Sequence, residues 1–311
     1  MSGIGVILNP HSRSNRKNPR RADHFGFIVG DKGSCHTTDG IEDVRNLARE
    51  FKERDVEVLA ISGGDGTYHH TLGIFIEVYN GIPLPKIAFL RGGTMNVVAT
   101  DLNIQGTPEF LLSQLITRYH REEVLKTRPV SVLKINDQYG FIFGLGLVYR
   151  FVREYYRISN NKPSKWHGLK LFSMVVVECL LNTRWIAHNC RSFDAQILVD
   201  EKEWPFKNYS CVLGGTVRSV GFGLNPFYAV YEDLSRFQMI GFSAPPRSSI
   251  LNFGPYILSR PHPSEHFLDS SPKSVQIQCR EPQGYTVDGE FYGSSESINI
   301  SLGTTLQVVV D

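Results

Sequence analysis

The sequence predicts an α/β domain built on a parallel sheet, followed by a domain of antiparallel strands. Over residues 1–127, short apolar runs alternate with segments of helical periodicity, a pattern typical of parallel strands covered by helices. Over residues 128–311, apolar and polar residues alternate with a period of two, which is typical of antiparallel strands in a β-sandwich or barrel. The change of period near residues 126–129 places the domain boundary, and the last strands can return to the first domain.

Strands and helices are expected to alternate along the first domain. The helix expected at 41–55 places four apolar side chains on one face, and the helix expected at 107–120 has a proline in its first turn. A third helix, at 68–81, is expected to end at Gly81 and Pro83. Buried strands are expected at Gly5–Asn9, Phe25–Gly30, 56–62 and 86–90.

The second domain is expected to open with a β-hairpin, in which strands 130–136 and 141–149 are joined by a turn at 137–140. One helix, at about 165–182, is expected to interrupt the strands. Glycine, proline, serine and asparagine separate the remaining strands, as in other antiparallel folds. These strands are expected at 195–200, 209–215, 236–243, 275–279, 285–293, 297–303 and 305–310.

The composition limits the class of protein. A net charge of +2 and a pI near 8.2 are too mild to favour a nucleic-acid partner. No signal peptide is visible, and the most apolar stretch, Leu169–Leu181, is too short to span a bilayer of about 30 Å. We therefore expect a cytoplasmic chain, soluble or peripheral to a membrane, without a transmembrane segment. Five widely spaced cysteines without a CxxC pair predict reduced thiols and no zinc or disulfide framework: Cys35, Cys179, Cys190, Cys211 and Cys279.

A glycine-rich turn, Gly63-Gly64-Asp65-Gly66-Thr67, follows the strand expected at 56–62. Ligands of open parallel sheets bind at the carboxyl ends of strands, and glycines allow a positive φ and close approach of a ligand. Backbone N–H groups at the start of the next helix suit a phosphate. The Asp65 carboxylate would repel that phosphate, so it suggests Mg²⁺ coordination or a base acting on a hydroxyl. The alternative is that Asp65 merely caps a helix.

Two further features accompany this turn. The segment Arg91–Asn96, with sequence RGGTMN, repeats the arrangement after the strand expected at 86–90. A third strand ends at Asn9-Pro10 and is followed by a basic run. The run is either a solvated surface or a contact for phosphates or an anionic membrane. The chain has neither a P-loop nor the HRD and DFG motifs of protein kinases. The basic run comprises His11, Arg13, Arg16, Lys17, Arg20 and Arg21.

These motifs resemble the diacylglycerol kinase catalytic family, which includes bacterial lipid kinases, sphingosine kinases and ceramide kinases. The resemblance covers nearly the whole chain, because the matching motifs occur in the family's order. GGDGT alone is shared with NAD kinases and phosphofructokinases, and its combination with GTxN and a late DGE is more specific. The motifs are Asn9-Pro10, GGDGT at 63–67, Gly93-Thr94-x-Asn96, 141–147, 225–240 and Asp288-Gly289-Glu290.

The resemblance implies a nucleotide-binding α/β domain, a β-rich domain and an active site in the cleft between them. It also implies an ATP- and Mg²⁺-dependent kinase that phosphorylates a lipid hydroxyl at a membrane surface, on diacylglycerol, sphingosine, ceramide or a similar acceptor. By resemblance, Asp65, Asp288 and Glu290 are catalytic, and Asp65 and Glu290 bind the metal. The implied nucleotide-binding residues are Asn9, Pro10, Gly63, Gly64, Gly66, Thr67, Gly93, Thr94 and Asn96.

The spacing of Asp288 and Glu290 supports a site independently of the resemblance. Residues i and i+2 of a strand point to the same face, so the strand expected at 285–293 would project both carboxylates together. The alternative is a hairpin tip, because Asp-Gly is a strong turn signal. With the other motifs present, the shared-face arrangement is favoured.

The chain departs from the family at two positions. His70 stands where many members have Glu, and Val97 stands where many have Asp. These losses leave open a catalytically weak lipid- or nucleotide-binding protein. An NAD kinase-like enzyme is disfavoured, because those enzymes carry an Asn-Glu motif and this chain has no such dipeptide. A homodimer is compatible with the sequence. An apolar groove for the lipid, or else plain core, is expected from Phe141, Phe143, Tyr155, Tyr156, Trp166, Leu169, Phe172, Met174, Val175 and Val176.

Overall fold

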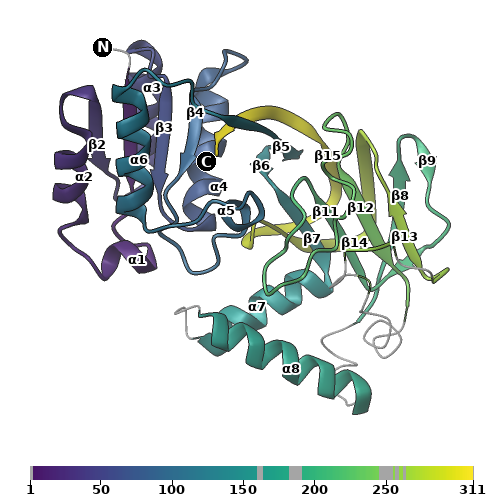
Figure 1. Ribbon diagram of the computed structural model, residues 1–311. Coiled ribbons are helices and arrows are strands. Elements are labelled where there is room, and N and C mark those ends of the chain that lie inside the picture. Colours follow the sequence, from purple (N-terminus) through teal and green to yellow (C-terminus); the bar gives the residue numbers. More distant parts are fainter. Residues whose placement is uncertain are drawn as a thin grey trace. The chain divides into compact units, whose positions relative to one another are not determined.

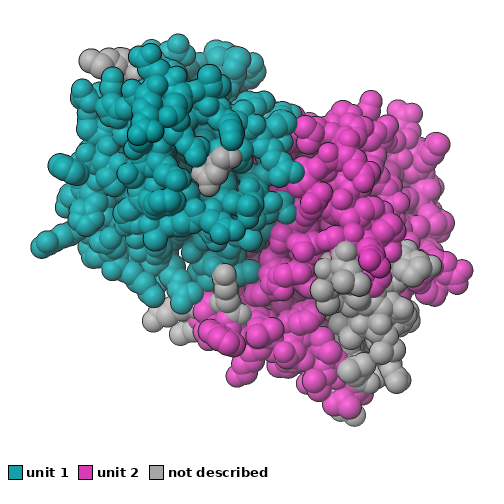
Figure 2. Space-filling view, in the orientation of Figure 1, with its two compact units in different colours: residues 1–130, 304–311 teal, residues 131–303 magenta. Residues whose placement is uncertain are grey.

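The computed structural model describes residues 3–159, 164–181, 191–244, 255, 259–261 and 264–310. Within 165–181 the side chains of Lys165, Cys179 and Leu180 are outside the description, as is the whole of Cys190. The chain divides into two compact units (Figure 2). Unit 1 comprises residues 1–130 and 304–311, and unit 2 comprises residues 131–303.

Unit 1 contains a parallel sheet in the order β4-β3-β1-β2 (Figure 1). Every residue of β1 and β3 is buried, which explains their apolar sequences. Leu8 is in register with both Thr37 and Ser62, so β1, β2 and β3 end at the same edge of the sheet. Val308 pairs in parallel with Ile87 on the other side of β4. The strands are β1 (Ile4–Leu8), β2 (Gly33–Thr37), β3 (Val58–Ser62) and β4 (Lys86–Phe89).

Helices connect these strands, and the predicted parallel α/β fold is confirmed. Helix α2 packs beside α6, and α3 packs beside α4. The face expected for α3 is correct, because its apolar residues between 44 and 51 are buried. The helices are α1 (Arg13–Arg16), α2 (Arg21–Val29), the 3₁₀ turn η1 (Gly30–Lys32), α3 (Ile41–Glu53), α4 (Asp65–Tyr79), α5 (Val97–Asp101) and α6 (Pro108–His120).

The strand predicted at Phe25–Gly30 is wrong, because this segment belongs to helix α2. Phe25 and Val29 are buried one helical turn apart, which is the spacing of a helix face. Phe27 between them is 90% exposed. The aromatic and β-branched residues imitated a strand. The true second strand, β2, has a polar sequence that carries little strand signal.

Unit 2 is built from antiparallel strands, as predicted. They pair in the order β13-β12-β11-β7-β14-β15, with β8 also on β14. The long strand β15 begins in unit 2 and ends in unit 1, and β5 enters unit 2 from unit 1. The strands are β5 (Thr127–Ile135), β6 (Gln138–Gly140), β7 (Ile142–Gly146), β8 (Phe193–Val199), β9 (Lys202–Glu203), β10 (Asn208–Tyr209), β11 (Cys211–Gly215), β12 (Gln238–Phe242), β13 (Phe267–Ser270), β14 (Ser274–Val287) and β15 (Glu290–Val309).

Two helices interrupt these strands, α7 (Leu147–Ser159) and α8 (Lys165–Leu181). Helix α8 was predicted, whereas residues 147–149 were predicted as strand and instead begin α7. Gly146 has φ +71° and turns the chain out of β7. None of the helices in the described part of the chain is long and apolar enough to cross a membrane.

Candidate functional site

The carboxyl ends of three neighbouring strands of unit 1 are joined by hydrogen bonds. After β1, the Asn9 N–H donates to the Ser62 carbonyl oxygen at 3.0 Å, and after β4 the Leu90 N–H donates to the Ile61 carbonyl oxygen at 2.9 Å. The side-chain amide of Asn9 donates to Oγ1 of Thr67 at 2.9 Å. Asn9 therefore connects the end of β1 to the first turn of α4.

The two predicted glycine turns lie directly against one another. A Cβ placed on Gly93 would be 2.3 Å from the Gly64 Cα, and a Cβ on Gly92 would be 2.9 Å from the Gly63 nitrogen. Such distances leave no room for a side chain. None of these four residues has a positive φ. Glycine is therefore required here for close backbone packing, and the positive φ that glycine allows is not used at these positions.

The N-terminus of α4 lies at this junction and is partly exposed. The helix begins at Asp65 with Gly64 as its N-cap, and Gly66 and Thr67 complete the first turn. All four residues are partly exposed. The first N–H groups of any α-helix lack partners within the helix and carry the positive end of the helix dipole. This end of α4 can therefore bind an anionic group such as a phosphate.

Asp65 connects the first glycine turn to the second. Its Oδ1 accepts a hydrogen bond of 2.6 Å from the Val97 N–H, the first residue of α5. Asn96 precedes it with φ +49°, and its side chain accepts from the Gly93 N–H at 3.0 Å. Asp65 thus caps α5, a helix other than the one it begins. The Asp65 carboxylate therefore holds the second turn in place.

Tyr68 also stabilises the junction of the two glycine turns. Its hydroxyl accepts a hydrogen bond of 2.9 Å from the Arg91 N–H. Burial, and then the nearby Asp65 carboxylate, raise the pKa of Tyr68 well above its ordinary value, so the phenol stays neutral. The Arg91 side chain donates to the Ile104 carbonyl oxygen at 2.6 Å. Sequence reasoning missed Tyr68, because an aromatic residue in an apolar helix gives no functional signal.

His70 and Val97, the two residues that differ from the family, both lie near the glycine turns in the sequence. Val97 contributes its backbone N–H to Asp65, so the turn holds Asp65 without the family's second carboxylate. His70 is exposed on α4, and the adjacent His69 is buried. Among the described residues, no three His, Cys, Asp or Glu side chains are grouped to hold a metal ion. The predicted pair of Thr94 and Asn96 lies in the second turn, with Thr94 partly exposed and Asn96 buried.

In unit 2, the prediction that Asp288 and Glu290 share one strand face is wrong. Strand β14 ends at Val287 and β15 begins at Glu290, so the two residues between them form a hairpin turn. Asp288 has φ +52° and Gly289 has φ +87°, values typical of a type I′ turn. The Asp-Gly pair therefore forms the turn that it signals, and the strand alternation expected at 285–293 is interrupted there.

The Asp288 side chain has a structural role in this turn. Its Oδ1 accepts hydrogen bonds of 2.9 Å from both the Phe141 and the Ile142 N–H groups. The Asp288 N–H donates to the Ile142 carbonyl oxygen, also at 2.9 Å. Glu290, partly exposed, follows directly, and burial together with these two carboxylates raises the pKa of Tyr292 to about 12. The turn thus anchors the start of β7, and Glu290 begins the strand β15 that follows the turn.

The residues expected to line an apolar groove separate into two sets. Phe141, Phe143, Tyr155 and Val175 are buried in the core of unit 2, as the alternative of plain core requires. In contrast, Trp166 is 80% exposed on α8. The opposite face of α8 packs on α7 through buried apolar side chains.

The segment that contains both glycine turns is similar to the diacylglycerol kinase catalytic domain. Residues 3–126 match the family model of the diacylglycerol kinase catalytic domain, which confirms the expected resemblance. A candidate lipid kinase of Staphylococcus aureus (strain bovine RF122 / ET3-1) is 28% identical over 167 residues, 52% of this chain and 48% of the relative. The chain therefore spans about half the length of the curated relatives it matches.

Solved structures show the same fold over the whole chain. A candidate diacylglycerol kinase from Bacillus anthracis str. Sterne has a TM-score of 0.73 at 19% identity, covering 100% of this chain and 97% of the other. A diacylglycerol kinase from the same strain has a TM-score of 0.67 at 16% identity, with the same coverage.

Proposed function

We propose that this protein is an ATP- and Mg²⁺-dependent lipid kinase, which transfers the γ-phosphoryl group to a lipid hydroxyl. The observation that carries the proposal is the direct packing of two glycine turns at the partly exposed N-terminus of α4, within the segment that matches the kinase family. Phosphoryl transfer depends mainly on positioning and charge neutralisation, which such backbone groups supply.

In this proposal, unit 1 holds the nucleotide. The N–H groups of the α4 first turn receive phosphate oxygens, and Asn9 fixes that turn through Thr67. The close packing of the two turns brings their backbones together beside the first turn of α4. The proposed nucleotide-binding residues are Asn9, Pro10, Gly63, Gly64, Gly66, Thr67, Gly93, Thr94 and Asn96.

The residues present fit a Mg²⁺ ion held mainly by the substrate. Proteins commonly bind Mg²⁺ with one or two carboxylates, waters and substrate phosphates. Asp65, which is partly exposed at the start of α4, and Glu290 are the two proposed ligands. Bound Mg²⁺ would neutralise phosphate charge. With or without Mg²⁺, the Asp65 carboxylate orients the second glycine turn through the Val97 N–H.

Glu290 is the proposed base for the acceptor hydroxyl, and Asp288, also a proposed catalytic residue, holds the turn that precedes Glu290. Oδ1 of Asp288 accepts hydrogen bonds from two backbone N–H groups. Glu290 is partly exposed at the start of β15. The acceptor is a lipid alcohol such as diacylglycerol, sphingosine or ceramide.

The outer face of α8 supports a membrane surface as the place of reaction. Trp166 is 80%, Leu169 51%, Val177 52% and Leu181 70% exposed. Helical spacing places these four on one stripe, which also carries exposed Lys170 and no carboxylate. A tryptophan, aliphatic side chains and a cation on one helix face suit the interface of an anionic bilayer.

We expect the double substitution Leu169→Glu and Val177→Glu to weaken binding to phosphatidylserine-containing vesicles by about tenfold or more, because two apolar side chains no longer leave water. Co-sedimentation measures this binding. Phe27→Glu is the matched control, because Phe27 is 90% exposed in unit 1 and outside the stripe. Unchanged vesicle binding by the double variant would show that the stripe has another role.

The proposed activity is tested by ATP-dependent transfer of labelled phosphate, with Mg²⁺, into mixed micelles that contain each candidate lipid in turn. We expect label in one lipid class and a loss of about 100-fold or more in Glu290→Gln, as for removal of a general base. Asp65→Asn is expected to lower transfer as well, and Glu77→Gln on α4 is the control. If ATP binds but no lipid is labelled, the alternative of a catalytically weak binding protein, suggested by His70 and Val97, is favoured.

A further inference from the structure

Asn15 is a buried hub behind the glycine turns. It is 2% exposed, and its amide nitrogen donates to the Asn9 carbonyl oxygen at 2.7 Å and to the Ser62 carbonyl oxygen at 3.0 Å. Its Oδ1 accepts from the Ser62 hydroxyl at 3.2 Å and from the Arg21 guanidinium at 2.8 Å. Both amide donors and both acceptor positions are therefore occupied. Asn15 joins the ends of β1 and β3 through one side chain.

The same loop reaches the second glycine turn. The Ser14 N–H donates to the Gly92 carbonyl oxygen at 3.0 Å. A Cβ on Gly92 would be 3.2 Å from Oδ1 of Asn15, so this amide packs directly under the turn. Through Asn15 and Ser14, the loop after β1 contacts the ends of all three strands that border the proposed nucleotide site.

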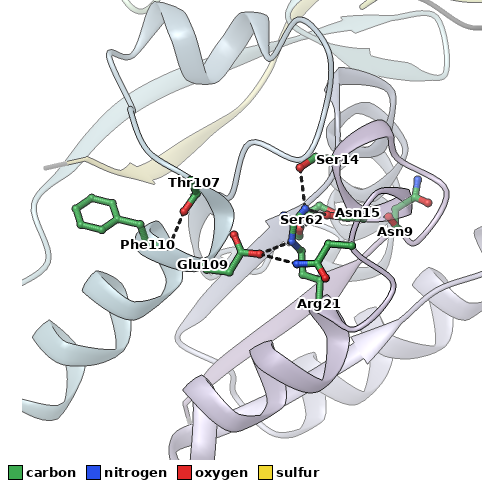
Figure 3. A network of polar contacts seen from close by, with 9 residues as sticks. Asn9, Ser14, Asn15, Arg21, Ser62, Thr107, Glu109 and Phe110 are labelled. Carbon is green, nitrogen blue, oxygen red and sulfur yellow. Dashed lines mark hydrogen bonds and ion pairs between the residues drawn. The ribbon is translucent and has the colours of Figure 1, made fainter.

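Arg21 fixes this loop from behind. It is 7% exposed, whereas the other arginines and the lysine of the basic run are exposed. Its guanidinium donates to Asn15 and to the Ser14 hydroxyl, both at 2.8 Å. Its Nε donates to Oε1 of Glu109 at 2.7 Å (Figure 3). Burying a guanidinium costs free energy unless its charge and its N–H donors are paired, so this arrangement needs the Glu109 carboxylate.

Glu109 is itself held in place by the start of α6. Thr107 caps this helix by accepting a hydrogen bond of 3.2 Å from the Phe110 N–H, and Pro108 occupies the first turn. Burial alone would raise the pKa of Glu109, but the hydrogen bonds from Arg21, from the backbone and from Asn18, together with the charge of Arg21, lower it. The carboxylate is therefore charged at neutral pH.

We infer that Asn15, Arg21 and Glu109 are positioning residues that set the spacing of the two glycine turns for nucleotide phosphates. The inference rests on the proposed function and goes beyond it, because none of the three side chains belongs to the motifs that define the site. Arg21 acts through Asn15: the guanidinium orients the amide, and the amide holds the carbonyl oxygens of Asn9 and Ser62.

The test is calorimetric binding of ATP with Mg²⁺, which does not depend on turnover. Arg21→Met keeps most of the side-chain stem but leaves Asn15 without its charged donor, so we expect ATP affinity to fall by about tenfold, the equivalent of one hydrogen bond to a charged group. Arg21→Lys restores the charge beside Glu109 and is expected to recover part of the affinity. Glu109→Gln keeps an acceptor for Arg21 and is expected to weaken ATP by less than Arg21→Met.

Arg45→Met is the matched control. Arg45 pairs with Glu77 at 3.1 Å between α3 and α4, without contact to the strand ends, so ATP affinity should be unchanged. A purely structural role would lower the melting temperature of Arg21→Met and Glu109→Gln and leave their ATP affinity native, which would overturn the inference. If the native chain itself fails to bind ATP, the proposed function fails instead. Should Arg21→Met not fold, Glu109→Gln and Arg21→Lys decide the question.

Discussion

Gly93→Ala is expected to weaken ATP binding by about tenfold or more, the equivalent of one lost hydrogen bond to a charged phosphate. The added Cβ would be 2.3 Å from the Gly64 Cα and 2.9 Å from Oδ1 of Asn96. The nearest atom belongs to the backbone of the facing turn, so the two turns must separate. Calorimetry with ATP and Mg²⁺ measures the loss.

Two further glycines make this prediction a graded series. A Cβ on Gly64 would be 3.0 Å from the Gly93 Cα, so Gly64→Ala should have an intermediate effect. A Cβ on Gly73, within α4, meets nothing within 4 Å. Gly73→Ala should keep native affinity and stabilise the protein by about 0.5–1 kcal/mol, because alanine favours the helix interior. Native ATP affinity in a folded Gly93→Ala protein would contradict the packing argument.

Asp288→Ala is expected to destabilise unit 2 by about 2–4 kcal/mol, because two partly buried N–H groups lose their acceptor. These are the N–H groups of Phe141 and Ile142, both 2.9 Å from Oδ1 of Asp288. Alanine also tolerates the φ of +52° poorly. Thermal unfolding followed by circular dichroism measures the effect.

Asp288→Asn separates structure from chemistry. Asparagine keeps an acceptor oxygen and tolerates a positive φ, so the melting temperature should remain close to native. Glu290→Gln should also keep native stability while losing lipid phosphorylation. Loss of phosphorylation in a stable Asp288→Asn protein would instead assign a direct chemical role to Asp288.

Much of the fold follows from patterns within single segments. The amphipathic helix α3 and the buried strands β3 and β4 carry the periodicity that their surroundings demand, so they were predicted correctly. Helix α2 was mistaken for a strand because its buried face is short and rich in strand-forming residues. The start of α7 was missed because Gly146 gives no sign in the sequence of the turn that it makes.

The candidate site was predicted where glycines reveal it and missed where tertiary contacts create it. GGDGT and GTxN identify the two turns, yet only the structure shows that they pack on each other. Arg21 was hidden in a basic run that is otherwise solvated, and nothing local connects it with Glu109. Likewise, the alternation around Gly289 could not show that the Asp288 carboxylate turns back to β7.

Strand β15 has a consequence for how the protein can be made. It leaves the Asp288–Gly289 turn, and Val308 at its far end pairs with Ile87 on β4. A ribosome releases β4 long before residue 308, so the nascent first unit waits with one edge of its sheet unpaired. Exposed strand edges invite pairing with other chains. Folding of unit 1 is therefore completed only after residue 308 has been synthesised, and a fragment that stops at residue 130 is expected to aggregate.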